Sequence, residues 1–179
     1  MPFWKPIGSD LLGAIHLANS RGGFEPQRGH NFELIITPPV GDAEILFKSV
    51  EASLGISHNS EPLQLPYMNE TIYIAGRPNY APGTVSYRDM VDKEVYSTLE
   101  AWYRLIYDVE TSEIGFAADY KTMASLILYD VKGGHLRQWD IIGIWPQDIS
   151  AEGPSHLSGD IYRLNVTFQF DKAKPLFAY

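Results

Sequence analysis

The sequence contains no cysteine among its 179 residues. This absence excludes disulfide frameworks, thiolate metal sites and cysteine nucleophiles. The five histidines show no metal-ligand spacing either, because no two of them lie two to five residues apart. We therefore expect neither a metal site nor a cofactor.

Positive charge is also scarce. The chain has 14 Lys and Arg residues against 22 Asp and Glu residues, which gives a formal net charge of −8. A protein that grips nucleic acid needs a basic surface to displace counterions from phosphates, so tight DNA binding is disfavoured. No apolar run approaches the roughly 20 residues that span a bilayer, and the first residues lack the pattern of a signal peptide. We expect no membrane insertion.

Catalytic motifs are missing as well. The segment 153–157 begins like a nucleophile elbow, but it lacks the closing glycine and has proline where a strand should enter the turn. The pair Gly133-Gly134 is flanked by strand patterns on both sides, unlike a phosphate-binding loop. The carboxylates of Glu110 and Glu113 fall in a polar loop, where solvated charge is the usual role. We predict that the protein is not an enzyme and has no catalytic residues.

The composition that remains is that of a globular protein. Hydrophobic residues make up 45% and charged residues 20%, and the length fits one domain. Glycine and proline are frequent in residues 1–30, which predicts an extended N-terminal arm. We expect a single domain over residues 31–172 and a C-terminal tail over residues 173–179.

Period-two alternation of apolar and polar residues predicts most of that domain as strands. The stretch 161–170 alternates most cleanly, with Leu164, Val166 and Phe168 on one face. Residues 31–37 and 44–50 are predicted to form a hairpin. Proline and glycine predict loops over 53–66, 76–83, 108–121 and 147–160. The remaining predicted strands are 71–75, 84–87, 124–131 and 136–145.

One helix is predicted between residues 89 and 108. Its apolar residues recur every three or four positions, and Asp89 or Asp92 is placed to cap its first turn. Since a single helix does not cover two sheet faces, the fold class is mainly β. We predict an antiparallel β-barrel or sandwich of about six or seven strands with one packed amphipathic α-helix. The apolar stripe consists of Val91, Val95, Leu99, Trp102 and Ile106.

Two stretches carry a family resemblance. The first, 66–76, contains Met-Asn and then Ala-Gly, and is followed by a strand and the helix with Trp102. The second contains a Gly-x-Trp-Pro strand end and then the alternating strand to Phe170. Their order resembles the tail-tube proteins of contractile-tailed bacteriophages, which are related to the inner-tube proteins of contractile injection systems. The resemblance covers residues 31–172, and the N-terminal arm and loop 108–121 depart from it. The family-motif candidates are Met68, Asn69, Ala75, Gly76, Trp102, Gly143, Trp145 and Pro146.

The resemblance implies a structural virion protein. Such proteins form homohexameric rings that stack into the inner tail tube, inside a contractile sheath, and DNA passes through the lumen without specific binding. The implied partners are further copies of the chain, the tail sheath protein, the tape-measure protein, the baseplate and the tail-terminator protein. The implied location is the tail of the virion, assembled in the host cytoplasm.

Three hypotheses assign parts of this role to particular residues. The polar face of the last strand is a candidate for facing the channel, through Arg163, Asn165, Thr167 and Gln169. The arm 1–30 and loop 53–66 are candidates for ring stacking, and deletion of residues 1–20 is expected to leave monomers or rings without tubes. The net negative charge predicts an acidic channel that keeps DNA from adhering. The stacking candidates in the loop are Ser57, His58, Asn59 and Glu61.

Two alternatives remain open at this stage. A baseplate-proximal or terminal ring protein would share the fold and cap the tube instead of extending it. A monomeric β-barrel that binds a small apolar ligand would be a stable monomer with a roomy apolar cavity. The sequence separates neither a tube subunit from a terminal ring, nor a phage from a bacteriocin or a secretion system.

Overall fold

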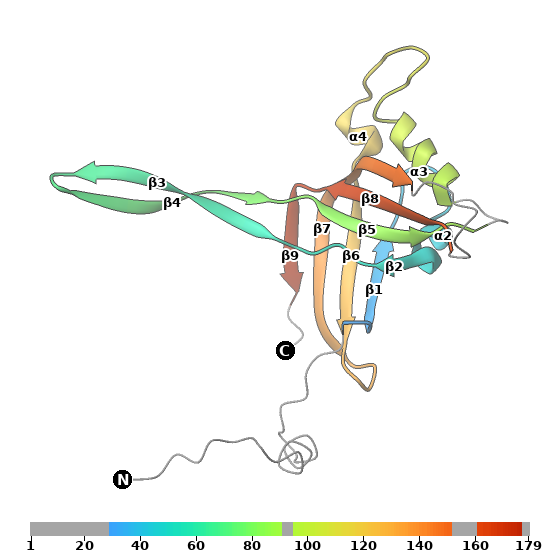
Figure 1. Cartoon of the computed structure of the whole chain (residues 1–179), viewed down its shortest axis with the longest axis horizontal. Helices are drawn as coiled ribbons and strands as arrows, with labels where there is room; N and C mark the ends of the chain where they lie inside the picture. The colour runs from blue at the N-terminus through green and yellow to red at the C-terminus, as the bar shows by residue number, and fades with distance from the viewer. Residues whose placement is uncertain (1–28, 91–94, 152–160, 177–179) are drawn as a thin grey trace, which may run out of the picture.

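The structure, a computed structural model, describes residues 29–90, 95–151 and 161–176. It consists of a β-barrel that is almost closed, short helices at one end of it and a long hairpin that projects away from it (Figure 1). The strands are β1 (Phe32–Ile36), β2 (Val50–Ala52), β3 (His58–Tyr67), β4 (Glu70–Tyr80), β5 (Gly83–Arg88), β6 (Thr122–Tyr129), β7 (His135–Ala151), β8 (Arg163–Gln169) and β9 (Lys172–Leu176); the helices are α2 (Ala43–Ser49), α3 (Val95–Arg104) and α4 (Ala117–Tyr120).

The long strand β7 joins two antiparallel sheets. Its first half pairs with β6 and β9, and β6 pairs with β1; these four strands are called sheet A. Its second half pairs with β8, which pairs with β5, which pairs with β2; these are called sheet B. The strands of the two sheets cross at a steep angle (Figure 1). The predicted fold class, a mainly β barrel with a packed helix, is confirmed.

The core lies between the two sheets and below α3. The alternating residues of β8 supply Leu164, Val166 and Phe168, all fully buried, as the period-two pattern predicted. Val95, Leu99 and Trp102 of α3 are also fully buried, which confirms these members of the predicted stripe. Val91 lies outside the described residues. The helix was predicted to reach residue 108, but it ends at Arg104, and Ile106 lies in the following turn and is only partly buried. Trp102 packs on Phe168 with ring centroids 5.8 Å apart.

Asp89 caps α3, as one of the two expected capping residues. Its Oδ1 accepts the backbone N–H of Val95 at 2.9 Å and that of Met90 at 3.1 Å. The carboxylate satisfies one of the helix's free N–H groups and lies at the positive end of its dipole.

The strand predicted at 44–50 is wrong, because residues 43–49 form helix α2. Asp42 Oδ1 accepts the N–H of Glu44 at 2.9 Å, and Lys48 pairs with Glu44 one turn away. This side-chain cap and the i,i+4 ion pair favour the helix locally. Burial of Leu46 in the core completes it. A seven-residue apolar window is too short for periodicity to separate helix from strand.

The loops predicted at 53–66 and 76–83 are also wrong over most of their length. Residues 58–67 form β3 and residues 70–80 form β4, which together make the projecting hairpin. Pro62 and Pro66 of β3 are compatible with a strand that has a free edge, where a missing N–H breaks no ladder bond.

Strand β7 was predicted to stop at Pro146, and it continues to Ala151. The ladder to β8 shifts register between Pro146 and Asp148, so a bulge accommodates the proline. The turn before β7 forms as predicted at Gly133-Gly134, but only Gly133 has a positive φ, of 80°. Asp130 closes this turn by accepting the N–H groups of Lys132 and Gly134 at 2.7 Å.

Candidate assembly surfaces

The outer face of sheet B is polar along β5 and β8. Side chains that alternate with the core residues of β5 and β8 meet in pairs across the ladder, Thr84 with Thr167 and Ser86 with Asn165. Ser86 Oγ donates to Asn165 Oδ1 at 2.6 Å. This face holds all four residues predicted to face the channel: Arg163, Asn165, Thr167 and Gln169.

An ion-pair network ends this face at β2. Glu51 accepts from Arg88 Nε at 2.6 Å and from Arg163 Nε at 2.7 Å, one on each carboxylate oxygen. These two charge-assisted hydrogen bonds lower the pKa of Glu51 below its ordinary value. The network links β2, β5 and β8 and neutralises much of the positive charge on the face.

Sheet B has two edges without a partner strand among the described residues. One is β2, and the other is the second half of β7 from Trp145. All three ladders between them are antiparallel, so β2 and this part of β7 run in opposite directions. Unpaired edges carry free N–H and C=O groups that template pairing with another chain.

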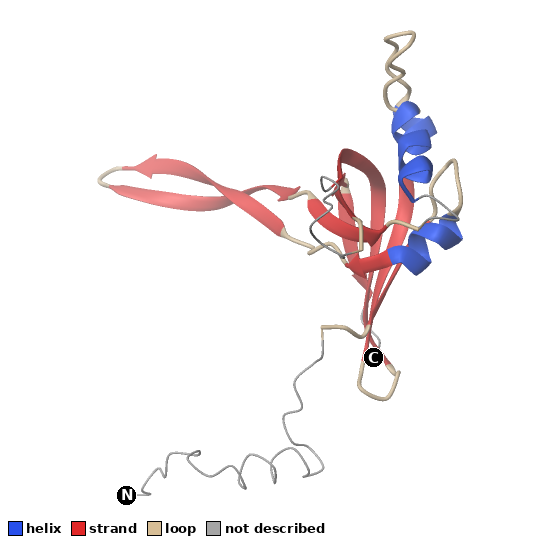
Figure 2. Cartoon of the chain, turned by 45° about the vertical axis from the view of Figure 1, so that its right-hand side comes forward, coloured by secondary structure: helices blue, strands red, loops and turns tan. Residues whose placement is uncertain are grey.

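The β3–β4 hairpin is exposed along almost its whole length. It prolongs the β2–β5 pair and points away from the barrel in both views (Figures 1 and 2). Cross-strand pairing places five apolar side chains on one face, each about half exposed. An isolated two-stranded hairpin is marginally stable in water, and exposed apolar faces of this kind are typical of contact surfaces, so this face is a candidate for assembly. The five are Leu63, Leu65, Tyr67, Ile72 and Ile74.

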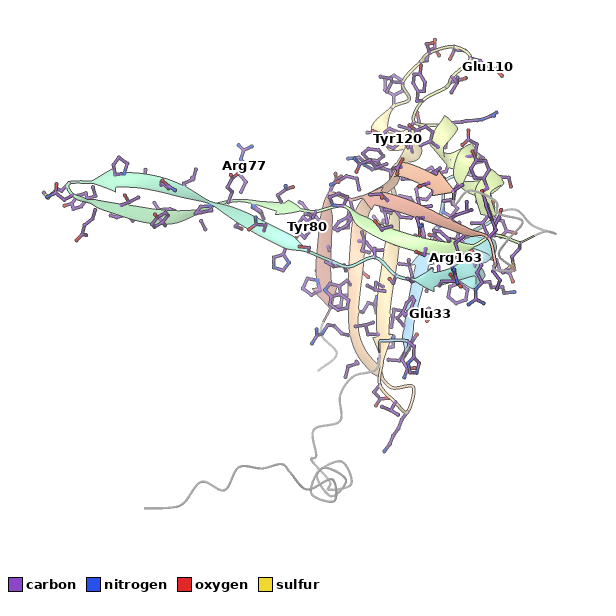
Figure 3. All side chains as sticks on the ribbon, in the orientation of Figure 1. Glu33, Arg77, Tyr80, Glu110, Tyr120 and Arg163 are labelled. Carbon is purple, nitrogen blue, oxygen red and sulfur yellow. The ribbon has the colours of Figure 1, made fainter. Side chains whose placement is uncertain are left out.

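The predicted stacking residues lie at the root of this hairpin. Ser57, His58, Asn59 and Glu61 are all exposed, and the His58 ring lies 6.2 Å from that of Tyr80 (labelled in Figure 3). The sequence reasoning missed the apolar face further out. Its signal was present in the alternation of Leu63, Leu65 and Tyr67, and the neighbouring prolines concealed it.

The first family motif forms the hairpin's tip and its far strand. Met68 and Asn69 are the two-residue turn, where Met68 has a φ of 52° and is 90% exposed. Ala75 and Gly76 lie in β4, and an added Cβ at Gly76 would come within 2.1 Å of the Glu61 carbonyl oxygen. Glycine there permits the bulge between Ser60 and Pro62 in β3.

The second motif lies where β7 passes from sheet A to sheet B. Gly143 has a φ of 71° and interrupts the β6–β7 register. Trp145 makes an edge-to-face contact with Tyr120 at 5.8 Å, and Pro146 is buried. Trp102, the remaining motif residue, donates its indole N–H to the Tyr120 carbonyl at 2.7 Å. Trp102 and Trp145 therefore meet at Tyr120, whereas Met68 and Asn69 lie at the hairpin tip, so the motif residues as a set do not form one site.

An open groove of about 1000 Å³ lies between β1 and β2, where the barrel does not close. Buried side chains of Leu34, Leu54 and Leu126 form part of its lining, and Phe47 at its rim is 40% exposed. Two carboxylates also line it, and both are engaged within the chain: Glu51 by the two arginines and Glu33 by the Tyr129 hydroxyl. The groove was not anticipated from the sequence.

In the parts of the chain that the structure describes, no group of three or more His, Asp or Glu is placed to hold a metal ion. No helix among the described residues is both long and apolar enough to cross a membrane. The absence of catalytic, cofactor and metal residues stays a prediction.

Comparison with known proteins found likeness in structure alone. No protein-family model and no curated protein matches the sequence. A chain in the anti-feeding prophage baseplate superposes with a TM-score of 0.62 at 11% identity, covering 86% of this chain and 97% of that one. The chain has the fold of contractile-tail tube proteins.

Two further structures share this tail-tube fold. The anti-feeding prophage tube-terminating cap has a TM-score of 0.61 at 12% identity, over 90% of this chain and 97% of that chain. The sheath–tube complex of the extracellular contractile injection system PVC has a TM-score of 0.58 at 12% identity, over 92% and 97%. The tail-tube fold thus occurs in baseplate, cap and tube structures of such particles.

Proposed function

We propose that the chain is a structural subunit that joins edge to edge into homohexameric rings, which stack into the inner tube of a contractile tail. The observation that carries the proposal is sheet B, with its polar outer face and two unpaired edges that run in opposite directions. The second half of β7 in one copy is therefore antiparallel to β2 in the next. Four strands per copy keep the alternation intact, so a ring of copies closes into one continuous antiparallel sheet.

The polar face of sheet B then lines the channel, with Arg163, Asn165, Thr167 and Gln169 among its side chains. Its described charges are balanced, with Glu51 and Asp148 against Arg88 and Arg163. Arginines that are already paired with carboxylates leave little free positive charge to bind the phosphate backbone of passing DNA. This supports a channel through which DNA moves without adhering. The acidic channel stays a prediction.

The hairpin supports stacking of the rings. Strands that pair around a ring run along its axis, and β3–β4 continues the β2–β5 pair in that direction (Figure 1). Its apolar face then meets the neighbouring ring, beside the root residues Ser57, His58, Asn59 and Glu61. The N-terminal arm, predicted as a second stacking element, lies outside the described residues.

The partners follow from this role: the sheath protein outside the tube, the tape-measure protein inside it, and the baseplate and tail-terminator proteins at its ends. Assembly would take place in the host cytoplasm before incorporation into the virion or a related injection particle.

A second candidate is a baseplate-proximal or terminal ring. It is favoured by the likeness to a baseplate structure and to a tube-terminating cap. Such a ring would form hexamers and stop there, whereas a tube subunit adds ring upon ring. The monomeric ligand-binding barrel is less well supported. Tyr87 and Phe168 are fully buried between the sheets, and the roomy apolar space at β1 and β2 is an open groove beside an edge strand that is unpaired within the described residues, not a closed cavity.

Sedimentation velocity over a concentration series tests the proposal. We expect a species of six-chain mass that is replaced by larger assemblies as concentration rises. A terminal ring would give the six-chain species without growth. A chain that sediments as a monomer at every concentration would contradict both readings.

A further inference from the structure

The loop between α3 and α4, residues 106–116, has a defined backbone structure held by internal hydrogen bonds, and several of its side chains are exposed. Tyr107 and Ile114 form a β-bridge, and Gly115 N–H donates to the Ile106 carbonyl at 3.0 Å. Ser112 turns the chain with a φ of 59°. An added Cβ at Gly115 would come within 2.0 Å of the Leu105 carbonyl oxygen, so the close return of the chain requires glycine there.

The side chains of this loop combine bare apolar groups with acidic ones. Val109, Ile114 and Phe116 are 71%, 80% and 81% exposed. Asp108, Glu110 and Glu113 add three carboxylates, and residues 106–116 contain no Lys or Arg. Large apolar side chains held this far out of the barrel indicate a surface that a partner covers.

The groove between β1 and β2 has the complementary chemistry. Its lining is largely apolar and includes Phe32, Leu54 and Trp139. Beside Trp139, the Arg137 guanidinium lies 5.5 Å from the indole centroid, is exposed and forms no ion pair within the described residues. The groove's own carboxylates are already satisfied by internal bonds. Arg137 thus leaves positive charge available to an acidic partner.

The two surfaces lie at opposite edges of sheet B. The loop joins α3 and α4, which both contact the second half of β7: Tyr96 and Tyr103 lie beside Ile149, and Tyr120 lies on Trp145. The groove borders β2, the other edge. Figure 3 shows Glu110 on the loop above the barrel and Glu33 lower down on the side of the barrel, beside β1.

We propose that the 106–116 loop of one copy docks in the β1–β2 groove of the next copy around the ring. Edge pairing of β7 with the neighbour's β2 carries the loop to that groove, so the contact is continuous with the proposed ring interface. Val109, Ile114 and Phe116 enter the apolar groove, and the loop's carboxylates approach Arg137. Every copy offers one loop and one groove, as a closed heterologous ring requires. The inference rests on the proposed function.

The absence of native cysteine makes thiol crosslinking a clean test. One preparation carries Val109→Cys and a second carries Ala52→Cys, an exposed groove residue. The two are mixed and assembled, treated with a short bis-maleimide, and the joined peptides are identified by mass spectrometry. The matched control replaces Ala52→Cys by Ala81→Cys, an exposed alanine on the hairpin side of the barrel. We expect the loop–groove product to exceed the control by about tenfold, since docking raises the local concentration of the two thiols.

The outcomes separate this inference from the proposed function. Six-chain particles with no preference for Ala52→Cys over Ala81→Cys would overturn the docking and leave the ring intact. Absence of particles from the unmodified chain would overturn both. A third preparation with Leu12→Cys and Ala52→Cys in one chain tests the other occupant: an intramolecular crosslink in assembled particles would assign the groove to the chain's own N-terminal segment and overturn the docking.

Discussion

The carboxylate of Asp171 lies against the backbone of Gly143. An added Cβ at Gly143 would come within 2.3 Å of Asp171 Oδ2, while Lys121 Nζ holds the same carboxylate at 2.8 Å and 2.9 Å. The N–H of Asp171 donates to the Ile142 carbonyl at 3.0 Å. A glycine with positive φ, a tight backbone approach and an ion pair thus fix the point where β7 leaves sheet A for sheet B.

Replacing Gly143→Ala is expected to lower the free energy of unfolding by about 3 kcal/mol, from left-handed strain and from displacement of Asp171. Urea unfolding of dilute protein measures it. The matched control is Gly133→Ala, whose position also has positive φ but no atom within 4 Å of the added Cβ. This control is expected to cost about 1 kcal/mol. Equal losses at the two positions would show that the approach of Asp171 is unimportant.

Tyr87 is fully buried, and its hydroxyl has no hydrogen-bond partner among the described residues. Tyr87→Phe is therefore expected to raise the free energy of unfolding by about 1 kcal/mol, by removing an unsatisfied polar group. Tyr129→Phe serves as the contrast, because its hydroxyl donates to Glu33, and this change is expected to destabilise. Thermal unfolding of both variants decides the matter, and a clear loss at Tyr87→Phe would count against the prediction.

Burial also raises the pKa of Tyr87 above its ordinary value. The folded state then keeps a proton that the unfolded chain releases above about pH 10, so stability falls as pH rises past that point. The Tyr87→Phe variant has no hydroxyl at this position and so lacks this pH-dependent loss of stability. Between pH 9 and 11, the unfolding free energy of Tyr87→Phe should therefore decline less steeply than that of the parent chain. The difference in slope should correspond to about one proton, the one that Tyr87 retains in the folded state.

The contribution of Glu51 to folding stability is expected to have the opposite pH dependence. Hydrogen bonds from Arg88 and Arg163 lower its pKa, so its stabilising contribution is present above the unfolded value of about 4.3 and is lost as pH falls through the folded value. Glu51→Gln should therefore differ from the parent most above about pH 5 and converge with it in acid. Glu61→Gln is the control, because Glu61 forms no ion pair in the described parts of the chain. A gap between the parent and Glu51→Gln that persists in acid would refute the linkage.

A substitution on the exposed face of the β3–β4 hairpin tests ring stacking without disturbing the fold of the subunit. Leu65→Glu places a charge on the apolar face of β3, whereas Gln64→Glu places the same charge on the opposite face. We expect Leu65→Glu to leave the six-chain ring intact and to reduce ring-on-ring growth by about tenfold or more, since burying an unpaired charge is costly. Light scattering during assembly measures growth. Equal growth of the two variants would mean that this face does not stack.

Much of the barrel could be predicted from local pattern. The predictions of a strand around Val166 and of a helix around Leu99 are correct because each element buries one face against the same core. The α2 helix was missed because its decisive signals, the Asp42 cap and the Glu44–Lys48 pair, lie beside an apolar run that suits either structure. The hairpin was missed because proline is read as a strand breaker, which does not hold at a free edge.

The assembly surfaces were less accessible to sequence reasoning. The groove arises where Phe32 and Leu54 approach across a gap in the barrel, a relationship set by topology and not by spacing. The polar face of β8 was predictable because its residues alternate with core residues. Its role depends on two edges, β2 and the second half of β7, that no local pattern reveals.

The most direct test of a subunit completed by its neighbours is negative-stain electron microscopy of the purified chain at high concentration. The account predicts rings with six-fold symmetry and a central channel, and tubes of stacked rings beside them. Fields of single compact particles, unchanged as concentration rises, would contradict it.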